Sequence, residues 1–189
     1  MTNDGLSIRL AQPDDKPAIE AMHFLSVHGL NSADYTARQI EAFIGYFGTY
    51  DPTLIDDGTY FVAELEGRII ASGGWSRRMP IFETEEGEQS VVCEGISADS
   101  AKIRSVFVHP KHTRRGLGSQ LVRLSEERAV AAGCRLLELW ATLTGVPLYR
   151  KLGYEEVGRL PFTAPDVDPL MSVHMAKVIP AEADSASAA

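Results

Sequence analysis

Residues 106–119 read Val106-Phe-Val-His-Pro-Lys-His-Thr-Arg-Arg-Gly-Leu-Gly-Ser119, and this stretch decides how the rest of the chain is interpreted. Its apolar start predicts a buried strand that ends at Pro110, followed by a basic loop and a helix opened by Gly116 and Gly118. A helix N-terminus carries unpaired backbone N–H groups and a partial positive charge, so it suits an anion, above all a phosphate. The glycines would let that anion approach the backbone. We interpret the turn as a pyrophosphate cradle.

The residues after this turn predict an amphipathic helix and then a second strand. The apolar side chains of the helix fall mostly on one stripe, formed by Leu117, Leu121, Val122, Leu124, Ala129 and Ala132. Gly133 stands where a C-terminal cap is expected. The segment 135–140 is apolar except at Glu138, which predicts a strand buried on both faces. The order strand, turn, helix, strand predicts a right-handed crossover between parallel strands.

Two other phosphate-binding motifs fail on spacing. A Walker loop has four residues between its glycines, followed by Lys and Ser or Thr, and neither feature is present. The dinucleotide fingerprint needs a third glycine three residues after the second, where this chain has Leu121. Taken alone, the Gly-x-Gly pair leaves two interpretations equally open: a phosphate site, or a tight loop with solvated arginines.

A second motif lies further along the chain and reads Pro147-Leu-Tyr-Arg-Lys-Leu-Gly-Tyr154. At this separation the two motifs together resemble the GNAT superfamily of acetyl-coenzyme A-dependent N-acyltransferases. That family has a strand ending in Val-x-Pro and a pyrophosphate loop of the form Gln/Arg-x-x-Gly-x-Gly/Ala. Its later short helix carries a Tyr and is closed by a Gly-aromatic pair. The resemblance is strongest over residues 103–159, and a weaker order of strands and helices extends it to most of the chain.

The resemblance implies an α+β fold of the α/β/α type, with a mixed central sheet of about six to seven strands flanked by about four helices. It also implies acetyl-coenzyme A as co-substrate and direct transfer of its acetyl group to a primary amine in a ternary complex. Backbone groups of the loop and of the strand before it would hold the coenzyme. The implied contacts are Val106, Phe107, Val108, Arg114, Arg115, Gly116, Leu117, Gly118 and Ser119.

Two positions depart from the family pattern. Thr113 stands where the loop usually begins with Gln or Arg, which removes a side-chain contact. Pyrophosphate binding in the family is mostly through backbone N–H groups, and Arg114 and Arg115 can supply the missing charge. Thr142 stands where many relatives have an Asn, so the hydrogen bonding of the pantetheine arm is expected to differ.

Tyr149, in the second motif, is implied by the resemblance to be the general acid that protonates the departing thiolate. A phenol titrates near pH ~10, close enough to a thiol to exchange a proton. Without the resemblance, a tyrosine at this place would more often be expected to anchor the helix through packing and one hydrogen bond.

The base that takes a proton from the amine is less clearly marked. Glu138 interrupts an apolar strand, so it should be buried and paired, with Arg104 on the neighbouring strand as the expected partner. A structural ion pair is the favoured interpretation and a general base the second. Glu94, in an acidic stretch, or a chain of water molecules could serve instead.

The rest of the chain predicts the other elements of such a fold. A short strand over 7–10 should precede one helix from Pro13 to near Gly29 and a second helix that follows residues 31–34. The remaining expectations are a hairpin over 59–65 and 68–75, a mobile loop over 83–100, a strand over 102–108, and closing strands over 155–160 and 170–178.

Length and composition predict one domain in residues 1–180 and a disordered tail in residues 181–189, and the resemblance implies that this single domain is an N-acetyltransferase (GNAT) domain. The 189 residues are 44% hydrophobic and 23% charged, as is usual for a globular domain. A net charge of −8 argues against a nucleic-acid partner. No apolar run is long enough to cross a membrane, so no membrane partner is expected.

The cytoplasm is the expected compartment, because the N-terminus lacks the pattern of a signal peptide. Cys93 and Cys134 suggest neither a disulfide framework nor a metal site. His109 and His112 lack a nearby thiol or carboxylate that would complete a ligand set, so no metal is expected. Family members often dimerise, which makes a homodimer compatible with the resemblance. The acceptor, a small molecule or a peptide amine, is not specified by the sequence.

Two rival functions fit parts of the pattern. A non-catalytic acyl-coenzyme A-binding sensor or regulatory module would keep the fold and the cradle, but would have no use for Tyr149. A plain interaction protein would use the Gly-x-Gly pair only as a turn.

Overall fold

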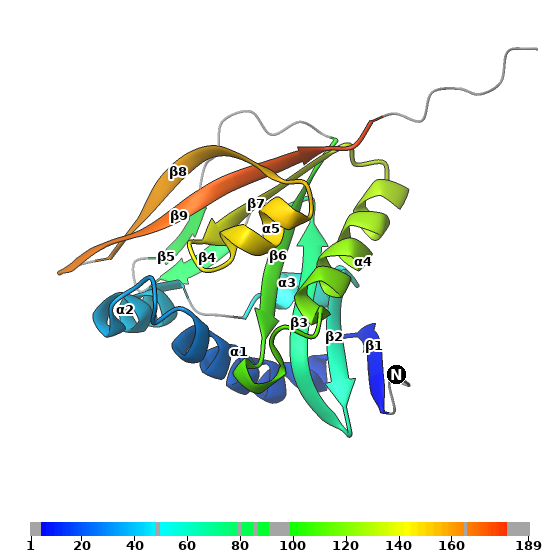
Figure 1. The fold of residues 1–189 in the computed structure, drawn as a ribbon, viewed down its shortest axis with the longest axis horizontal. Helices are drawn as coiled ribbons and strands as arrows, with labels where there is room; N and C mark the ends of the chain where they lie inside the picture. The colour runs from blue at the N-terminus through cyan, green and yellow to red at the C-terminus, as the bar shows by residue number, and fades with distance from the viewer. Residues whose placement is uncertain are drawn as a thin grey trace, which may run out of the picture.

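The computed structural model describes residues 5–47, 50–78, 81–84, 87–90, 99–164 and 166–180. At its centre is a seven-stranded mixed sheet in the order β1-β2-β3-β6-β7-β9-β8, while β4 and β5 form a separate hairpin (Figure 1). The strands are β1 (Leu6–Leu10), β2 (Tyr60–Leu65), β3 (Arg68–Ser76), β4 (Ile81–Thr84), β5 (Gly87–Ser90), β6 (Ser100–Val108), β7 (Leu136–Thr142), β8 (Glu155–Ala164) and β9 (Val167–Val178). The expected α+β fold with six to seven central strands is confirmed.

Helices cover both faces of the sheet. One face carries α1 (Lys16–Leu30), α2 (Ala37–Phe47) and α3 (Pro52–Asp56), and the other carries α4 (Leu117–Ala131) and α5 (Val146–Lys151) (Figure 1). Two short 3-10 turns, η1 (Pro13–Asp15) and η2 (Pro110–His112), lead into α1 and toward α4. Among the described residues, no helix is both long and apolar enough to span a membrane.

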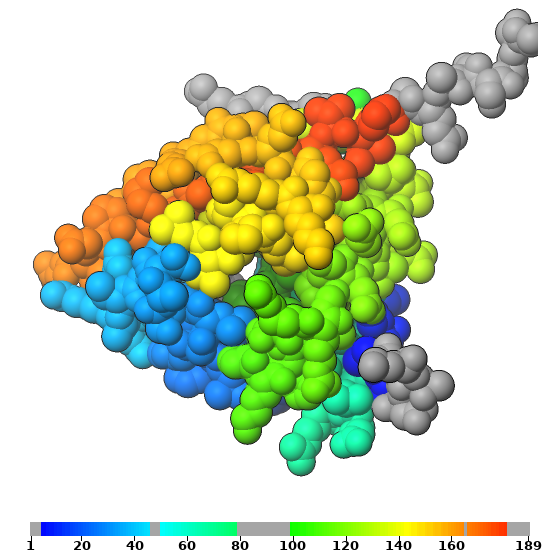
Figure 2. Space-filling model, in the orientation of Figure 1, coloured from blue at the N-terminus to red at the C-terminus, as the bar shows by residue number. Residues whose placement is uncertain are grey.

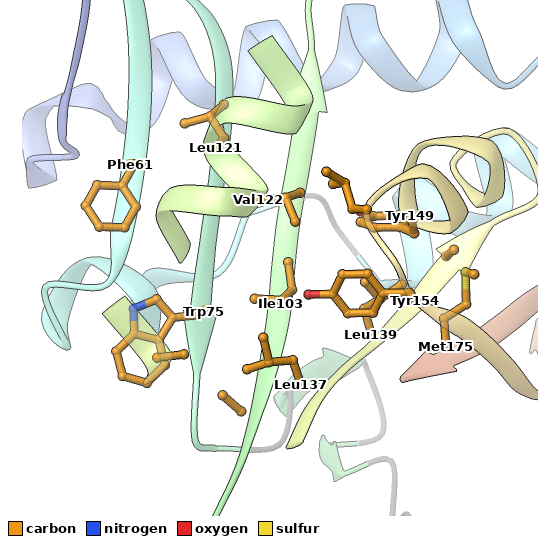
Figure 3. Close-up of a cluster of buried hydrophobic side chains, with 14 of the residues drawn as sticks. Phe61, Trp75, Ile103, Leu121, Val122, Leu137, Leu139, Tyr149, Tyr154 and Met175 are labelled. Carbon is orange, nitrogen blue, oxygen red and sulfur yellow. The ribbon is translucent and has the colours of Figure 1, made fainter. Parts of the chain in front are cut away.

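The largest apolar cluster lies between the sheet and the pair α4 and α5. Leu121 and Val122 of α4 are fully buried and point at the sheet, where Ile103 of β6 lies (Figure 3). Each such side chain contributes about 1.5–3 kcal/mol when it leaves water. This packing holds the start of α4 firmly against β6, so the turn between them has a fixed position.

Strands β6 and β7 separate after a short paired stretch. Their parallel pairing covers Ser100–Lys102 against Leu136–Glu138, and no pairing between them is recorded beyond Lys102 within the described residues. Strand β6 nevertheless continues to Val108 beside β3, and β7 continues to Thr142 beside β9. The sheet therefore opens into a wedge between two strands that run in the same direction.

Strand β6 contains a bulge on its β3 side. The register joins Phe107 to Ser72 but Arg104 to Gly74, so one residue too many lies on β6 between these pairs. Ser105 there has φ +52°, a left-handed value that is uncommon for a residue with a side chain.

Two sequence expectations about strands were wrong. Strand β7 is fully buried on one face only, at Leu137, Leu139 and Ala141, because the face with Glu138 and Trp140 receives thinner cover. The segment 83–100 was expected to be a loop, yet its first part contributes to the β4–β5 hairpin. That part of the chain is polar and lacks the alternating apolar pattern by which strands are predicted.

Candidate active site

The turn before α4 has the backbone geometry of an anion site. Gly116 is the N-cap of α4 with φ +82°, and Arg114 also lies in the left-handed region with φ +63°. Within the described ranges, the four backbone amides from Gly116 to Ser119 have no recorded acceptor in the chain. These N–H groups and the helix dipole can therefore serve a diphosphate. Gly116 is required here because other residues rarely adopt this backbone conformation.

Packing gives a second reason, besides the predicted approach of an anion, for a glycine at position 118. A Cβ atom at this position would lie 3.2 Å from Leu148 Cδ2 of α5 and 3.7 Å from Val108 Cγ2 of β6. The missing side chain thus allows the first turn of α4 to pack closely against α5 and β6. Its amide remains available at the helix end.

The amides of β6 beyond the bulge point in alternating directions. His109 N donates to Ile70 O of β3 at 2.8 Å, whereas Val108 N donates to Ser26 Oγ of α1 at 3.3 Å. Because the direction alternates along a strand, Val106 N shares the side of Val108 N, away from β3. Of the three strand residues expected to contact coenzyme, Val106 and Val108 have their amides on the side of the wedge, where that of Val108 is bonded to Ser26 Oγ. Phe107 is paired in register with Ser72 of β3.

The wedge is hollow in the space-filling view. Figure 2 shows an opening bounded by α1, by the segment that joins β7 to α5, and by the segment that leads into α4. Ser26 on α1 faces this region through its contact with Val108 N. Ser26 carries no signal in the sequence, because one serine on an amphipathic helix is not distinctive.

Tyr149 lies on the α5 side of the wedge. It is 8% exposed and its ring is edge-on to Tyr154, with ring centroids 5.9 Å apart (Figure 3). Burial raises the pKa of the Tyr149 phenol above its ordinary value. The hydroxyl is therefore protonated at neutral pH and can donate.

Glu138 is paired, but not with the partner that was expected. One carboxylate oxygen contacts Lys102 Nζ, and the other lies 3.1 Å from His174 Nε2. Arg104 instead pairs with Asp51, the N-cap residue of α3. The prediction that Arg104 pairs with Glu138 was wrong because the register places Lys102, two residues earlier on the same face of β6, opposite Glu138.

His174 and Trp140 complete this polar cluster, and neither was singled out from the sequence. Their rings are stacked at 4.8 Å with an interplanar angle of 5°, and Lys102 Nζ lies 5.9 Å from the centre of the Trp140 ring. Lys102 is 1% exposed, so its charge depends on Glu138 for compensation. A weak signal did exist, since Ser172 and His174 alternate with apolar residues in the last strand.

The two histidines of the phosphate loop have local roles. His109 Nδ1 accepts a hydrogen bond from Lys111 N at 3.1 Å and so caps η2. The His109 and His112 rings meet edge to face at 5.4 Å. In the part of the chain that the structure describes, no group of three or more His, Cys, Asp or Glu residues could hold a metal ion. Glu94, Cys93 and the tail 181–189 lie outside the described residues.

Comparison with known proteins finds a matching family and a relative in sequence. Residues 24–154 match the model of the acetyltransferase (GNAT) family. An uncharacterized N-acetyltransferase of Methanocaldococcus jannaschii is 28% identical over 108 residues, which cover 53% of this chain and 41% of that protein.

Solved structures share the fold over nearly the whole chain. A GCN5-related N-acetyltransferase from Rhodopseudomonas palustris superposes with a TM-score of 0.69 at 20% identity, over 95% of this chain and 99% of the other. The PaiA N-acetyltransferase of Thermoplasma acidophilum, solved in complex with coenzyme A, has a TM-score of 0.61 at 16% identity, over 94% and 99% of the two chains.

Proposed function

The chain belongs to the GNAT family of acetyltransferases, and from this premise we propose that it transfers the acetyl group of acetyl-coenzyme A to a primary amine by direct attack in a ternary complex. The observation that carries the proposal is the set of four unsatisfied amides at the start of α4, beside the wedge between β6 and β7. The diphosphate would bind these amides, with Arg114 and Arg115 adding charge.

The pantetheine arm would then lie along the open side of β6. Val106 and Val108 would offer their amides to it, as parallel strands that diverge leave such groups unpaired. Val108 N is held by Ser26 Oγ at 3.3 Å, so binding of the arm would exchange this hydrogen bond for one to a coenzyme carbonyl. Such an exchange is nearly neutral in energy, about 1 kcal/mol or less.

The reaction needs a donor for the developing oxyanion and a proton for the leaving sulfur. A neutral amine attacks the thioester carbonyl carbon, the C–N bond forms, and the C–S bond then breaks. Val106 N would stabilise the negative charge on the thioester oxygen. Tyr149 would give its proton to the thiolate, and the amine proton would leave to a base or to water.

Two measurements test the proposed activity. Isothermal titration calorimetry with acetyl-coenzyme A should detect binding well below millimolar ligand, and a panel of primary amines should release free thiol in the presence of enzyme. Binding without thiol release across a broad panel would favour the non-catalytic sensor. Absence of binding at millimolar ligand would favour an interaction protein.

Glu138→Gln tests the two roles left open for this carboxylate. We expect the ascending limb of the pH profile of kcat/KM to stay in place, because both carboxylate oxygens are already engaged by Lys102 and His174. The folded state should lose about 3–5 kcal/mol, since the 1%-exposed Lys102 would no longer face a negative charge. That loss corresponds to a Tm lowered by roughly 6–20 °C.

The control is Glu126→Gln, which breaks a comparable pair with Lys177 at 3.0 Å. That pair joins α4 to β9, so the change should lower Tm without altering the pH profile. Loss of the ascending limb in Glu138→Gln alone would assign the base to Glu138 and overturn the ion-pair role.

A further inference from the structure

Ser105, the bulged residue of β6, accepts a hydrogen bond from a side chain of the neighbouring strand β3. Ser72 Oγ of β3 donates to Ser105 O at 3.2 Å, and Ser105 is the residue with φ +52°. A residue with a side chain keeps this backbone conformation only where its surroundings hold it. The carbonyl contact from Ser72 is such a restraint.

Ser72 is itself held by a buried network that reaches α1. His23 Nε2 lies 2.8 Å from Ser72 Oγ and 3.0 Å from the Tyr60 hydroxyl. All three side chains are buried, with exposed fractions of 0% for His23 and Ser72 and 1% for Tyr60. The His23 ring also packs against Phe107, with centroids 4.0 Å apart, on the far side of the bulge.

Ser72 donates to Ser105 O, because a carbonyl oxygen only accepts. In the His23 tautomer that carries its proton on Nε2, the ring donates to Ser72 Oγ and leaves the Ser72 proton for Ser105 O. The Tyr60 hydroxyl lies beside the same ring nitrogen. In this tautomer His23 orients the Ser72 hydroxyl toward Ser105.

The carbonyl of Ser105 and the amide of Val106 belong to one peptide group. That group is planar and trans, so its C=O and N–H point in opposite directions. A donor that holds Ser105 O on the β3 side therefore aims Val106 N–H toward the wedge. Donation to the carbonyl also polarises the peptide and strengthens its N–H as a donor.

We propose that Ser72, oriented by His23, is a positioning residue that aims the Val106 amide at the acyl oxygen of the thioester. The inference rests on the proposed function, because it assumes that the acyl oxygen lies in the wedge. Ser72 acts through the peptide of Ser105 and Val106 and touches no reacting atom. Loss of the Ser72 hydroxyl should therefore weaken the contact to the acyl group and leave binding of the rest of the coenzyme unchanged.

The test compares Ser72→Ala with Ser76→Ala. Ser76 is also buried on β3, at 1% exposed, but its hydroxyl oxygen accepts from Arg78 N at 2.9 Å, away from the bulge. Removal of an oxyanion donor typically costs ~10²–10³ in kcat, and a misdirected donor should retain part of its effect. We expect Ser72→Ala to lower kcat by about tenfold or more and to weaken acetyl-coenzyme A relative to free coenzyme A. Ser76→Ala should leave both quantities unchanged.

Two further measurements test the positioning role separately. The first shows whether Ser72→Ala merely disturbs folding, and the second does not depend on acetyl transfer. Ser72→Thr keeps the hydroxyl and should recover most of the rate. In the protein without ligand, the Val106 amide resonance should shift in Ser72→Ala and stay in place in Ser76→Ala. This NMR result decides the positioning role even if wild-type protein transfers no acetyl group, which would refute only the proposed function. Equal kcat and an equal Val106 resonance in the two alanine variants would overturn the inference.

Discussion

Gly116→Asp should abolish measurable binding of acetyl-coenzyme A. The new carboxylate would stand at the N-cap of α4, beside the four amides proposed to receive the diphosphate. Like charges placed together at a binding site cost several kcal/mol, and each 1.4 kcal/mol is tenfold in affinity. The dissociation constant from calorimetry should therefore rise by at least ~100-fold.

Strain must be separated from charge in this experiment, because Gly116 has φ +82°. Gly58 provides the control, since it has φ +65° in the turn after α3 and a Cβ there would meet nothing within 4 Å. Gly58→Asp should lower Tm by a similar amount and leave coenzyme binding intact. Gly116→Ala, which adds strain but no charge, should give an intermediate affinity. Tight binding by Gly116→Asp would contradict the cradle.

Tyr149→Phe should lower kcat by ~10- to 10³-fold while the affinity for coenzyme A stays nearly unchanged. The substitution removes one oxygen from a side chain that is 8% exposed, so packing within the cluster of Figure 3 is retained. The only group lost is the hydroxyl that we propose protonates the leaving thiolate. Steady-state thiol release gives kcat, and calorimetry gives the affinity.

Tyr154→Phe is the matched control, because this second buried phenol faces Tyr149 edge-on at 5.9 Å. It should leave kcat unchanged. Burial raises the pKa of Tyr149 above its ordinary ~10, so its proton remains in place through the neutral and mildly alkaline range. A fall in rate below pH ~10 therefore cannot come from ionisation of Tyr149. Equal turnover of Tyr149→Phe and wild-type protein would refute the acid role.

The sequence was most informative about features that depend on residues adjacent along the chain. The strand ending near Pro110, the left-handed Gly116 and the helix after it lie within about a dozen residues. A turn glycine and a helix start are set by local backbone preferences, so their spacing can be read directly. The hairpin of β2 and β3 is also local, with its turn at Glu66 and Gly67. The α3 helix was missed, although Asp51-Pro52 is a recognisable N-cap and first-turn pair.

Contacts between distant segments could not be derived in this way. The partner of Glu138 depended on the register of two parallel strands: Lys102 and Arg104 lie on the same face of β6, and nothing local distinguishes them. The polar cluster around Glu138 draws on three strands, with His174 contributed from near the end of the chain.

The sequence by itself determined the fold class, through the resemblance of its two motifs to a known family, and the turn that opens α4, because a left-handed glycine and a helix start depend on short-range backbone geometry and residue type. Only the tertiary structure decided the bulge at Ser105, the hydrogen bond from Ser72 to Ser105 O and the hydrogen bond from Val108 N to Ser26. These features join α1, β3 and β6, which are distant in sequence. Their geometry is set by how helices and strands pack into one core, and no local pattern in the chain records that packing.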